Sequence, residues 1–456
     1  MNKFDVEFTK ESLISNAGLI LFFSYLEDSI LRHFLSPTLS CGNPNYIYSD
    51  FDIIRSFLAM QASGHSNFED LDFFRSCSFF KQVIGDDAIV SKERFRQRLD
   101  LMALHNSSLI GNLSKLNQFL LKQHAQPKSI PAFPFIPLDF DVTIFDNSDS
   151  HKQGVRPTYQ HNIDGYAPMM TYLGHQGYLL NHQFRSGNFH ANCKGTLEYI
   201  LQTVKLAKGL TDQPILARFD SGNDSMINAI HLSKIENLNF IIKRNIRSKQ
   251  YREMMIKEVL EQHTYCVENQ QGIKIYHFEK TELIQYFDKD VAIQADVRKI
   301  FSLIERKVDK YGQLLLVPVY DLHAWWTDLD EKLYPIESII ELYKDHATSE
   351  QFHSEYKTEL DIEKLPSGKF LTNELILALS QITYNIMRFI GQKVLACDHY
   401  LIKRKVSRLK IKTVLRKIIG LPAKYMIKNR RACLKIPLNH PFSETFKWLY
   451  LKSNFV

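Results

Sequence analysis

The chain has 456 residues, a formal net charge of +7, 45% hydrophobic residues and 23% charged residues. This composition is ordinary for globular proteins, and the length predicts more than one domain. No run of about 18 apolar residues occurs, which excludes a conventional membrane-spanning helix. The opening residues also lack the apolar core of a secretory signal.

Six cysteines are scattered along the chain, and none forms a C-x-x-C pair. That spacing argues against a disulfide framework or a zinc site, and it is typical of a protein in a reducing compartment. We therefore expect a cytoplasmic protein with no membrane partner.

The positive charge is concentrated near the C-terminus. Residues 401–440 hold thirteen Lys or Arg and no Asp or Glu, whereas the rest of the chain is net acidic. Such a stretch is typical of a segment that binds a polyanion, most simply DNA or RNA. The alternative is a solvated pair of basic helices. The candidate DNA contacts within it are Arg404, Lys405, Arg408 and Lys410.

Residues 1–127 show mostly helical periodicity. Apolar residues recur at helical spacing in "LISNAGLILFFSYLEDSILRHFL" and in "FDIIRSFLAMQA". The proline-rich stretch "QPKSIPAFPFIP" then marks a boundary. We expect a helical N-terminal domain that serves DNA binding or assembly.

Strand patterns follow this boundary. "LDFDVTIFD" alternates strictly and carries Asp141 on its polar face, and "PMMTYLG" with "YLLNHQF" predicts a hairpin. "KGTLEYILQTVKLAKG" predicts a helix, "PILARFD" a strand that ends at Asp220, "SMINAIHLSKIEN" a helix and "NFIIKRN" a strand. The order strand, strand, strand, helix, strand, helix, strand resembles that of an RNase H-like fold, a mixed sheet flanked by helices.

Residues 246–334 interrupt this order. "TYCVENQQGIKIYHF" and "KIFSLIERKVDKYGQLLLVPVYDL" predict two hairpins, so we expect a β-rich insertion, which also holds Trp325 and Trp326. Helical patterns resume at Pro335. The predicted α/β architecture has five segments: a helical N-terminal domain (1–127), the RNase H-like domain in two parts (128–245 and 335–400), the β-rich insertion (246–334) and a basic helical C-terminal region (401–456).

A carboxylate ends an apolar helical stripe. Ile336, Ile340, Tyr343, Ala347 and Glu350 follow one another at steps of four, three, four and three, which places them on one helical face. We therefore expect Glu350 to point toward the sheet. A buried charge is costly unless it is paired or binds a metal.

Two further carboxylates have compatible places. Asp141 and Asp220 belong to strands that are neighbours in an RNase H-like sheet, so we expect both to converge with Glu350. Three carboxylates without a His or Cys ligand set suit a hard cation such as Mg²⁺, with Mn²⁺ as a substitute. Two such ions about 4 Å apart activate an attacking oxygen and stabilise a leaving oxygen at a phosphodiester. Taken singly, each residue is more simply a solvated or hydrogen-bonded carboxylate.

These motifs resemble those of the DDE transposases of bacterial insertion sequences, in particular the family numbered thirteen-eighty, whose RNase H-like domain carries a β-rich insertion. "LDFDVT" is similar to the first-aspartate strand and "ILARFDSG" to the second-aspartate motif. The spacing Tyr343, His346, Glu350 and Lys357 is similar to the family signature of Tyr, Arg, Glu and Lys, with His346 standing where the signature has Arg.

The resemblance implies Asp141, Asp220 and Glu350 as catalytic metal ligands, and Tyr343 and Lys357 as phosphate contacts. His346 would contact DNA through its ring N–H, unless another residue supplies the grip that arginine gives. Relatives with such an insertion stack a tryptophan on a flipped base, for which Trp325 and Trp326 are the candidates; the alternative is that the pair fills the insertion's own core.

The resemblance also implies a magnesium-dependent enzyme that cuts the terminal inverted repeats of an element in double-stranded DNA and joins them to target DNA. It would act as a homodimer on DNA, in the bacterial cytoplasm at the nucleoid. Two other hypotheses remain open from the residues: a non-catalytic DNA-binding protein descended from a transposase, and a structure-selective nuclease of the same fold.

Overall fold

The computed structural model describes residues 5–36, 48–85, 89–105, 108–268, 273–288, 291–308, 313–399 and 406–452. The chain divides into two compact units. The helical unit comprises Met1–Gln126, Ile144–Tyr166 and Phe352–Val456, and the sheet unit comprises Pro127–Thr143 and Ala167–Gln351. The boundaries between these units differ from the boundaries of the five predicted segments. The predicted boundaries stay predictions.

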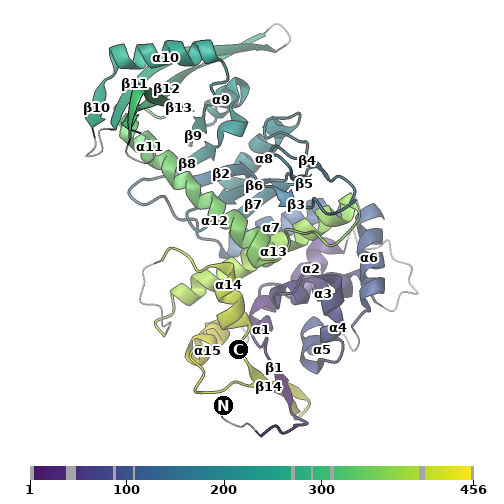
Figure 1. Ribbon diagram of the computed structural model, residues 1–456. Helices are drawn as coiled ribbons and strands as arrows, with labels where there is room; N and C mark the ends of the chain where they lie inside the picture. The colour runs from purple at the N-terminus through teal and green to yellow at the C-terminus, as the bar shows by residue number, and fades with distance from the viewer. Residues whose placement is uncertain are drawn as a thin grey trace. The chain divides into compact units, whose positions relative to one another are not determined.

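The helical unit is built around one long buried helix, α13 (Phe370–Leu395), on which α3, α6, α7 and α14 pack (Figure 1). Its apolar residues face all round the helix, as expected for a helix in the centre of a bundle. The other helices are α1 (Leu19–Phe23), α2 (Asp28–Leu35), α3 (Asp50–Ala62), α4 (Leu71–Phe74), α5 (Ser78–Ile84), α6 (Lys92–His105), α7 (Leu109–His124), α14 (Ile411–Val414) and α15 (Ser443–Lys452), with α12 (Thr348–Ser354) crossing the boundary between the units.

Despite its apolar sequence, α13 does not qualify as a membrane span: within the described ranges, no helix combines the length and the apolar character needed to cross a bilayer. Its interior polar groups are paired instead. Gln61 Nε2 donates to Ser380 Oγ at 2.7 Å, and Asn385 Nδ2 donates to Asn117 Oδ1 at 2.7 Å. Buried polar groups of this kind need partners, and here they fix which helices meet α13.

The helical unit also contains two small antiparallel sheets. One consists of β3 (Phe145–Asp146), β5 (Asp164–Tyr166) and β4 (Arg156–Pro157); the other consists of β1 (Ser12–Ile14), β14 (Ala423–Lys428) and β15 (Arg431–Lys435). The second sheet corrects the prediction that the C-terminal region is helical throughout. Asn429 and Arg430 both have positive φ, which closes β14 and β15 into a two-residue hairpin, and Ala423 and Tyr425 alternate into the core.

The sheet unit holds a nine-stranded mixed sheet flanked by helices, which confirms the predicted α/β class. Its strand order is β10-β11-β12-β13-β9-β8-β2-β6-β7. The strands predicted first along the chain are present in the predicted order: β2 (Ile136–Val142), β6 (Met169–Leu173), β7 (Tyr178–Gln183), α8 (Thr196–Lys208), β8 (Ile215–Phe219), α9 (Met226–Leu232) and β9 (Leu238–Lys243). β2, β8 and β9 are mutually parallel, and β6 is antiparallel to both β2 and β7.

The strands of the predicted insertion extend the same sheet. They are β10 (Tyr265–Glu268), β11 (Lys274–Asp288), β12 (Val291–Val308) and β13 (Leu314–Thr327), and β13 pairs with β9. Both predicted hairpins are present. A helix that the sequence reading missed, α10 (Lys249–Gln262), lies across β11, β12 and β13 and buries Met255 and Val259 on them (Figure 1).

Candidate active site

Asp141 and Asp220 lie at the carboxyl ends of neighbouring parallel strands. Phe140 on β2 pairs with Phe219 on β8, and their rings stack with centroids 4.6 Å apart. Each aspartate is the next residue along its strand, so the register brings the two carboxylates side by side. Ligands of α/β sheets bind beyond such strand ends, because the loops there leave side chains accessible.

The Asp220 carboxylate is held in place from one side. Its Oδ1 accepts hydrogen bonds from Gly222 N at 3.2 Å and from Asn223 Nδ2 at 2.9 Å. Burial raises the pKa of Asp220 above its ordinary value, and the nearby negative charge of Asp141 raises it further. Two oxygen-donor carboxylates that repel each other fit a divalent cation, since a bound cation relieves that repulsion.

A second, buried pair lies one step deeper in the same two strands. Arg218 on β8 pairs in register with Asp139 on β2. Its Nε donates to Asp139 Oδ1 at 2.6 Å and its Nη2 to Oδ2 at 2.8 Å, with both side chains almost fully buried. Burial alone would raise the pKa of Asp139, but Arg218 and His346 beside it lower the pKa to about 2. Asp139 is therefore ionised at neutral pH.

Arg218 also reaches the helical segment that carries the transposase-like signature. Its Nη1 donates to Leu342 O at 2.8 Å and to Asp345 Oδ2 at 2.9 Å. Leu342 belongs to α11 (Ile336–Lys344), and Asp345 opens the 3₁₀ turn Asp345–Ala347 that follows. The sequence reading missed Arg218 and Asp139. The sequence does contain a pattern that points to them: D-x-D in "LDFDVT" and R-x-D in "ARFDSG". Because residues two apart in a strand share a face, Asp139 lies on the same face as Asp141, and Arg218 on the same face as Asp220.

His346 points into the sheet and not toward solvent. It is 7% exposed, and its Nδ1 lies 2.9 Å from Asp139 Oδ1. Tyr343, one turn earlier, places its ring 5.6 Å from that of His346. Burial raises the pKa of Tyr343, and the charges of Asp220 and Asp141 raise it further. Their roles as DNA contacts stay predictions.

Glu350 is exposed, which corrects the expectation that it continues the buried stripe. The buried face of the segment runs through Ile339, Leu342, His346 and Ser349 instead. The predicted stripe lies one residue further along the helix than the buried one. The buried positions keep steps of three, four and three, so Glu350 falls one residue past the buried face. Throughout the described ranges, no three His, Cys, Asp or Glu side chains form a group able to hold a metal ion. The assignment of Glu350 as a ligand stays a prediction.

Both tryptophans of the insertion are buried. Trp325 belongs to the core cluster between α11 and the sheet, with Ile241, Ile300 and Leu342. Arg244 covers the Trp326 ring, with its guanidinium carbon 4.2 Å from the ring centroid. Neither indole N–H has a hydrogen-bond partner in the part of the chain that the structure describes. Base stacking on Trp326 would therefore require Arg244 to move.

Lys357 belongs to the helical unit, in a π-helical turn at Glu355–Glu359. Its Nζ donates to Ile144 O at 2.6 Å and lies 3.3 Å from Glu363 Oε1. Its ammonium thus has protein partners in this structure, and its contact with DNA stays a prediction.

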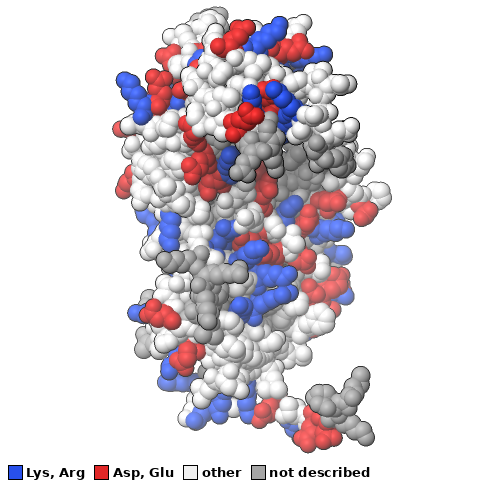
Figure 2. Space-filling view, turned by 60° about the vertical axis from the view of Figure 1, so that its left-hand side comes forward, with Lys and Arg blue, Asp and Glu red and all other residues white. Residues whose placement is uncertain are grey.

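The candidate basic residues near the C-terminus differ in their surroundings. Arg404 and Lys405 lie outside the described residues. Arg408 donates from Nε to the buried Glu355 Oε1 at 3.0 Å, whereas Lys410 is exposed. On the face that Figure 2 shows, Lys and Arg are interspersed with Asp and Glu.

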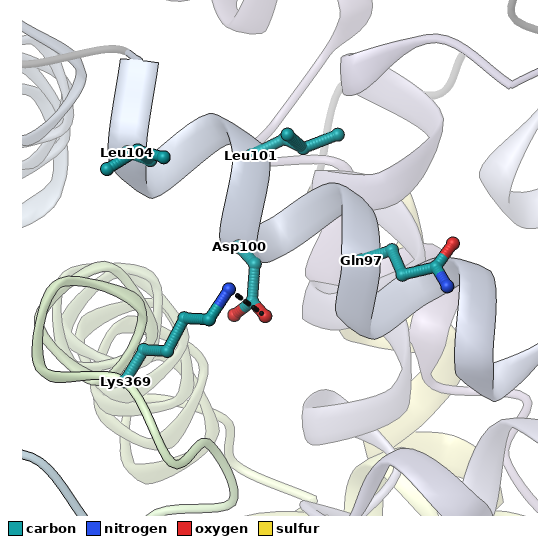
Figure 3. A pocket seen from close by; sticks show the side chains of 5 residues that line it. All are labelled: Gln97, Asp100, Leu101, Leu104 and Lys369. Atoms are coloured by element: carbon teal, nitrogen blue, oxygen red, sulfur yellow. Dashed lines mark ion pairs between the residues drawn. The ribbon is translucent and has the colours of Figure 1, made fainter.

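A pocket in the helical unit contains none of the predicted site residues. Gln97, Asp100, Leu101 and Leu104 of α6 line it together with Lys369 (Figure 3). Lys369 Nζ pairs with Asp100 Oδ2 at 3.0 Å, and Thr372 Oγ1 donates to Asp100 Oδ1 at 2.7 Å. The Asp100 carboxylate is thus already bound by residues of its own chain.

The model of the family described as transposase DDE domain group 1 matches residues 1–453, and the chain belongs to that family. The protein is accordingly a DNA transposase, and DDE transposase domains use divalent metal ions.

Among solved structures, the chain is similar to the piggyBac transposase in a synaptic complex with hairpin DNA, determined by cryo-EM. The TM-score is 0.43 at 14% identity, covering 89% of this chain and 80% of that chain. That likeness is too weak to transfer any residue role. No curated protein sequence matches the chain.

Proposed function

We propose that Asp141, Asp220 and Glu350 are the metal-binding catalytic residues with which this transposase cuts the ends of a mobile element and joins them to target DNA. The observation that supports this most is the side-by-side placement of Asp141 and Asp220 at parallel strand ends, with the pKa of Asp220 raised by burial and by Asp141. The proposed ion is Mg²⁺, with Mn²⁺ as a substitute, because carboxylate oxygens are the ligands that hard cations prefer.

When bound, the ions activate an attacking oxygen and stabilise the leaving oxygen of the phosphodiester. In the first step a water oxygen bonds to phosphorus, the bond from phosphorus to the 3′ oxygen breaks, and that oxygen takes up a proton. In the second step this 3′-hydroxyl attacks a phosphorus of the target, and the target's own 3′ oxygen leaves. Gly222 and Asn223 keep the Asp220 carboxylate in one orientation throughout.

Several finer assignments belong to the same proposal. Tyr343, His346 and Lys357 contact the DNA backbone, and Trp325 or Trp326 stacks on a flipped base. Arg404, Lys405 and Lys410 bind DNA electrostatically, whereas Arg408, predicted with them, serves the fold through its bond to Glu355. Two copies of the chain act together on paired terminal inverted repeats. The catalytic domain is RNase H-like, which the strand order β7-β6-β2-β8-β9 supports, and the chain groups with the family numbered thirteen-eighty.

The test is cleavage of the cognate element-end DNA in Mg²⁺ by the wild type and by Asp141→Ala, Asp220→Ala and Glu350→Ala. Each variant should lose more than the roughly 10–100-fold that removal of an outer-shell partner costs, because a ligand itself is removed. Glu341→Ala is the matched control: Glu341 is an exposed glutamate on α11, and its loss should leave the rate unchanged. Full activity in any of the three variants would remove that residue from the site.

A further inference from the structure

Four hydrogen bonds from one guanidinium join three parts of the sheet unit. Arg218 on β8 binds both carboxylate oxygens of Asp139 on β2, the carbonyl of Leu342 on α11, and Asp345 of the 3₁₀ turn. With Arg218 1% and Asp139 2% exposed, this pair is screened from water. A buried ion pair contributes little stability by itself compared with apolar packing. We therefore attribute to this pair a role in fixing the relative positions of the elements that it joins.

The pair lies directly beneath the proposed metal site. Asp139 and Asp141 share one face of β2. Asp220, the extended residue that follows β8, continues the face of Arg218, because side chains two residues apart in an extended chain point the same way. The spacing of Asp139 and Arg218 is fixed by their paired hydrogen bonds. The next residues on that face, Asp141 and Asp220, inherit this spacing.

The Arg218 guanidinium also fixes the position of the helical segment formed by α11 and the 3₁₀ turn. Its bond to Leu342 O lies at the end of α11, where the α-helix gives way to the 3₁₀ turn. A side chain that bonds a carbonyl at this point stabilises the change of helix type. The bonds to Leu342 and Asp345 thus tie the segment that carries Tyr343, His346 and Glu350 to β8.

We propose that Arg218 is a positioning residue of the transposase site: together with Asp139 it fixes the two metal-binding strands and the signature helix in one arrangement, and it holds His346 with Nδ1 protonated and Nε2 bearing the lone pair. This proposal rests on the proposed roles of Asp141 and Asp220.

The orientation of His346 follows from the chemistry of its partner. A carboxylate bound to a guanidinium through both oxygens accepts hydrogen bonds and donates none, so the proton between Asp139 Oδ1 and His346 must belong to Nδ1. In the neutral ring Nε2 is then the acceptor nitrogen. An aspartate that fixes an imidazole in this way is a familiar means of orienting a functional histidine.

Lysine is not equivalent to arginine at position 218. It has the same charge, but it lacks the planar fork that meets both oxygens of Asp139 while also reaching Leu342 O and Asp345. Arg218→Lys thus keeps the charge and removes the geometry. Arg98→Lys is the matched control, since Arg98 is likewise a buried arginine paired with a buried carboxylate, Asp50, but lies in the helical unit.

The test is ¹⁵N NMR of the full-length, metal-free protein labelled at histidine, with the His346 signals assigned as those absent from the spectrum of His346→Gln. The wild type should show the Nδ1-protonated pattern at His346. Asp139→Asn should shift the ring toward the Nε2-protonated form, because the acceptor-only carboxylate is replaced, and Arg98→Lys should leave it unchanged. A wild-type ring protonated on Nε2 alone would overturn the proposal.

Cleavage of element-end DNA in Mg²⁺ gives the second measurement. Arg218→Lys should lower kcat by about 10–100-fold with little change in KM, as loss of an outer-shell partner does. If Arg218→Lys does not fold, Asp345→Asn replaces it, because Asp345 is partly exposed and takes part in only one of the four bonds; it should also lower kcat. Unchanged kcat in the folded variant would overturn the proposal.

The proposed metal ligands and the proposed positioning role of Arg218 can be refuted independently. Asp141→Asn and Asp220→Asn should abolish cleavage while His346 keeps its Nδ1-protonated pattern. If these variants cleave DNA normally, the proposed metal ligands are wrong, whatever the ring of His346 shows. If they are inactive but Arg218→Lys retains the wild-type kcat, the positioning role of Arg218 is wrong.

Discussion

Glu355 shows how a single buried carboxylate organises its surroundings. It is 1% exposed and accepts hydrogen bonds from Arg388 Nη2 at 2.8 Å, Arg408 Nε at 3.0 Å and Ile411 N at 3.2 Å. Burial of a charge is costly unless every lone pair is used, and here two guanidinium groups and a backbone amide use them. Glu355 therefore anchors the start of the basic C-terminal segment to α13.

Glu355→Gln should destabilise the helical unit by about 3–5 kcal/mol, because it leaves the buried Arg388 without a counter-charge. The measurement is urea-induced unfolding followed by circular dichroism. Asp149→Asn is the control in the same unit: Asp149 is exposed and pairs only with the exposed Lys364, so it should change stability by less than about 1 kcal/mol. Equal effects of the two variants would contradict the role given to Glu355.

Asp328 gives the sheet unit a pH dependence. Burial raises the pKa of Asp328 to about 6, although Phe240 N donates to it at 2.9 Å. Because the folded protein holds this proton more tightly than the unfolded chain, whose pKa is 3.8, the stabilising effect of protonation is complete below about pH 4 and is lost as the pH rises to about 6.

Asp328→Asn should therefore be more stable than the wild type at pH 7, by roughly 1–3 kcal/mol, since the asparagine oxygen still accepts from Phe240 and no charge is buried. At pH 4 the advantage should disappear. Urea midpoints at the two pH values measure this difference. A variant whose midpoint matches the wild type at both pH values would show that Asp328 is not the group responsible.

At the scale of elements, a turn decides the structure near the C-terminus. The Asn429–Arg430 turn gives the β14–β15 hairpin where a helix was predicted. Positive φ costs little for asparagine but is unfavourable for arginine. The hairpin therefore carries strain at Arg430.

Arg430→Gly should stabilise the helical unit by about 0.5–1 kcal/mol, since Asn-Gly is the favoured sequence for this kind of turn. Arg431→Gly removes the same charge one residue later, inside β15, and should destabilise instead, because glycine weakens a strand. Thermal melts of the two variants at equal ionic strength give the comparison. Stabilisation by both would indicate that loss of charge, not turn geometry, is the cause.

At the scale of the whole molecule, the basic C-terminal segment serves two purposes that the structure separates. Arg408 pairs with the buried Glu355, whereas Lys410 is exposed. DNA binding by exposed cations releases counterions, so each phosphate that a cation neutralises contributes about 0.9 to the slope of log K against log salt. A cation that is paired with a buried carboxylate stabilises the folded protein, and it contributes little to this salt slope.

The triple variant Arg404→Gln, Lys405→Gln and Lys410→Gln should weaken DNA binding and reduce the salt slope by about 0.9 for each phosphate that is no longer neutralised. Arg408→Gln should mainly lower thermal stability. Fluorescence anisotropy over a series of salt concentrations measures the slope. Lys364→Gln, an exposed lysine outside the segment, is the control and should leave the slope unchanged. An unchanged slope in the triple variant would exclude the segment from the DNA interface.

The sequence by itself determined the α/β class, the strand and helix order between residues 136 and 243, and Asp141 and Asp220 as neighbouring strand-end residues. These follow from local patterns: strict alternation in "LDFDVT", helical spacing in "KGTLEYILQTVKLAKG", and the turn after "ARFD". The two hairpins of the insertion were likewise predictable, since each consists of apolar strand patterns around a glycine-containing turn.

Only the tertiary structure decided which charged side chains form buried ion pairs and which face the proposed metal site. The alternating pattern of β2 does not distinguish the roles of Asp139 and Asp141. The register with β8 places Arg218 beside Asp139 and Asp220 beside Asp141, so the first is paired and the second faces another carboxylate. Helical spacing also leaves open which of two adjacent stripes is buried: the structure buries Leu342, His346 and Ser349, and Glu350 is exposed. The physical reason is the same in both cases: burial and pairing depend on residues brought close by the fold, and no local pattern records them.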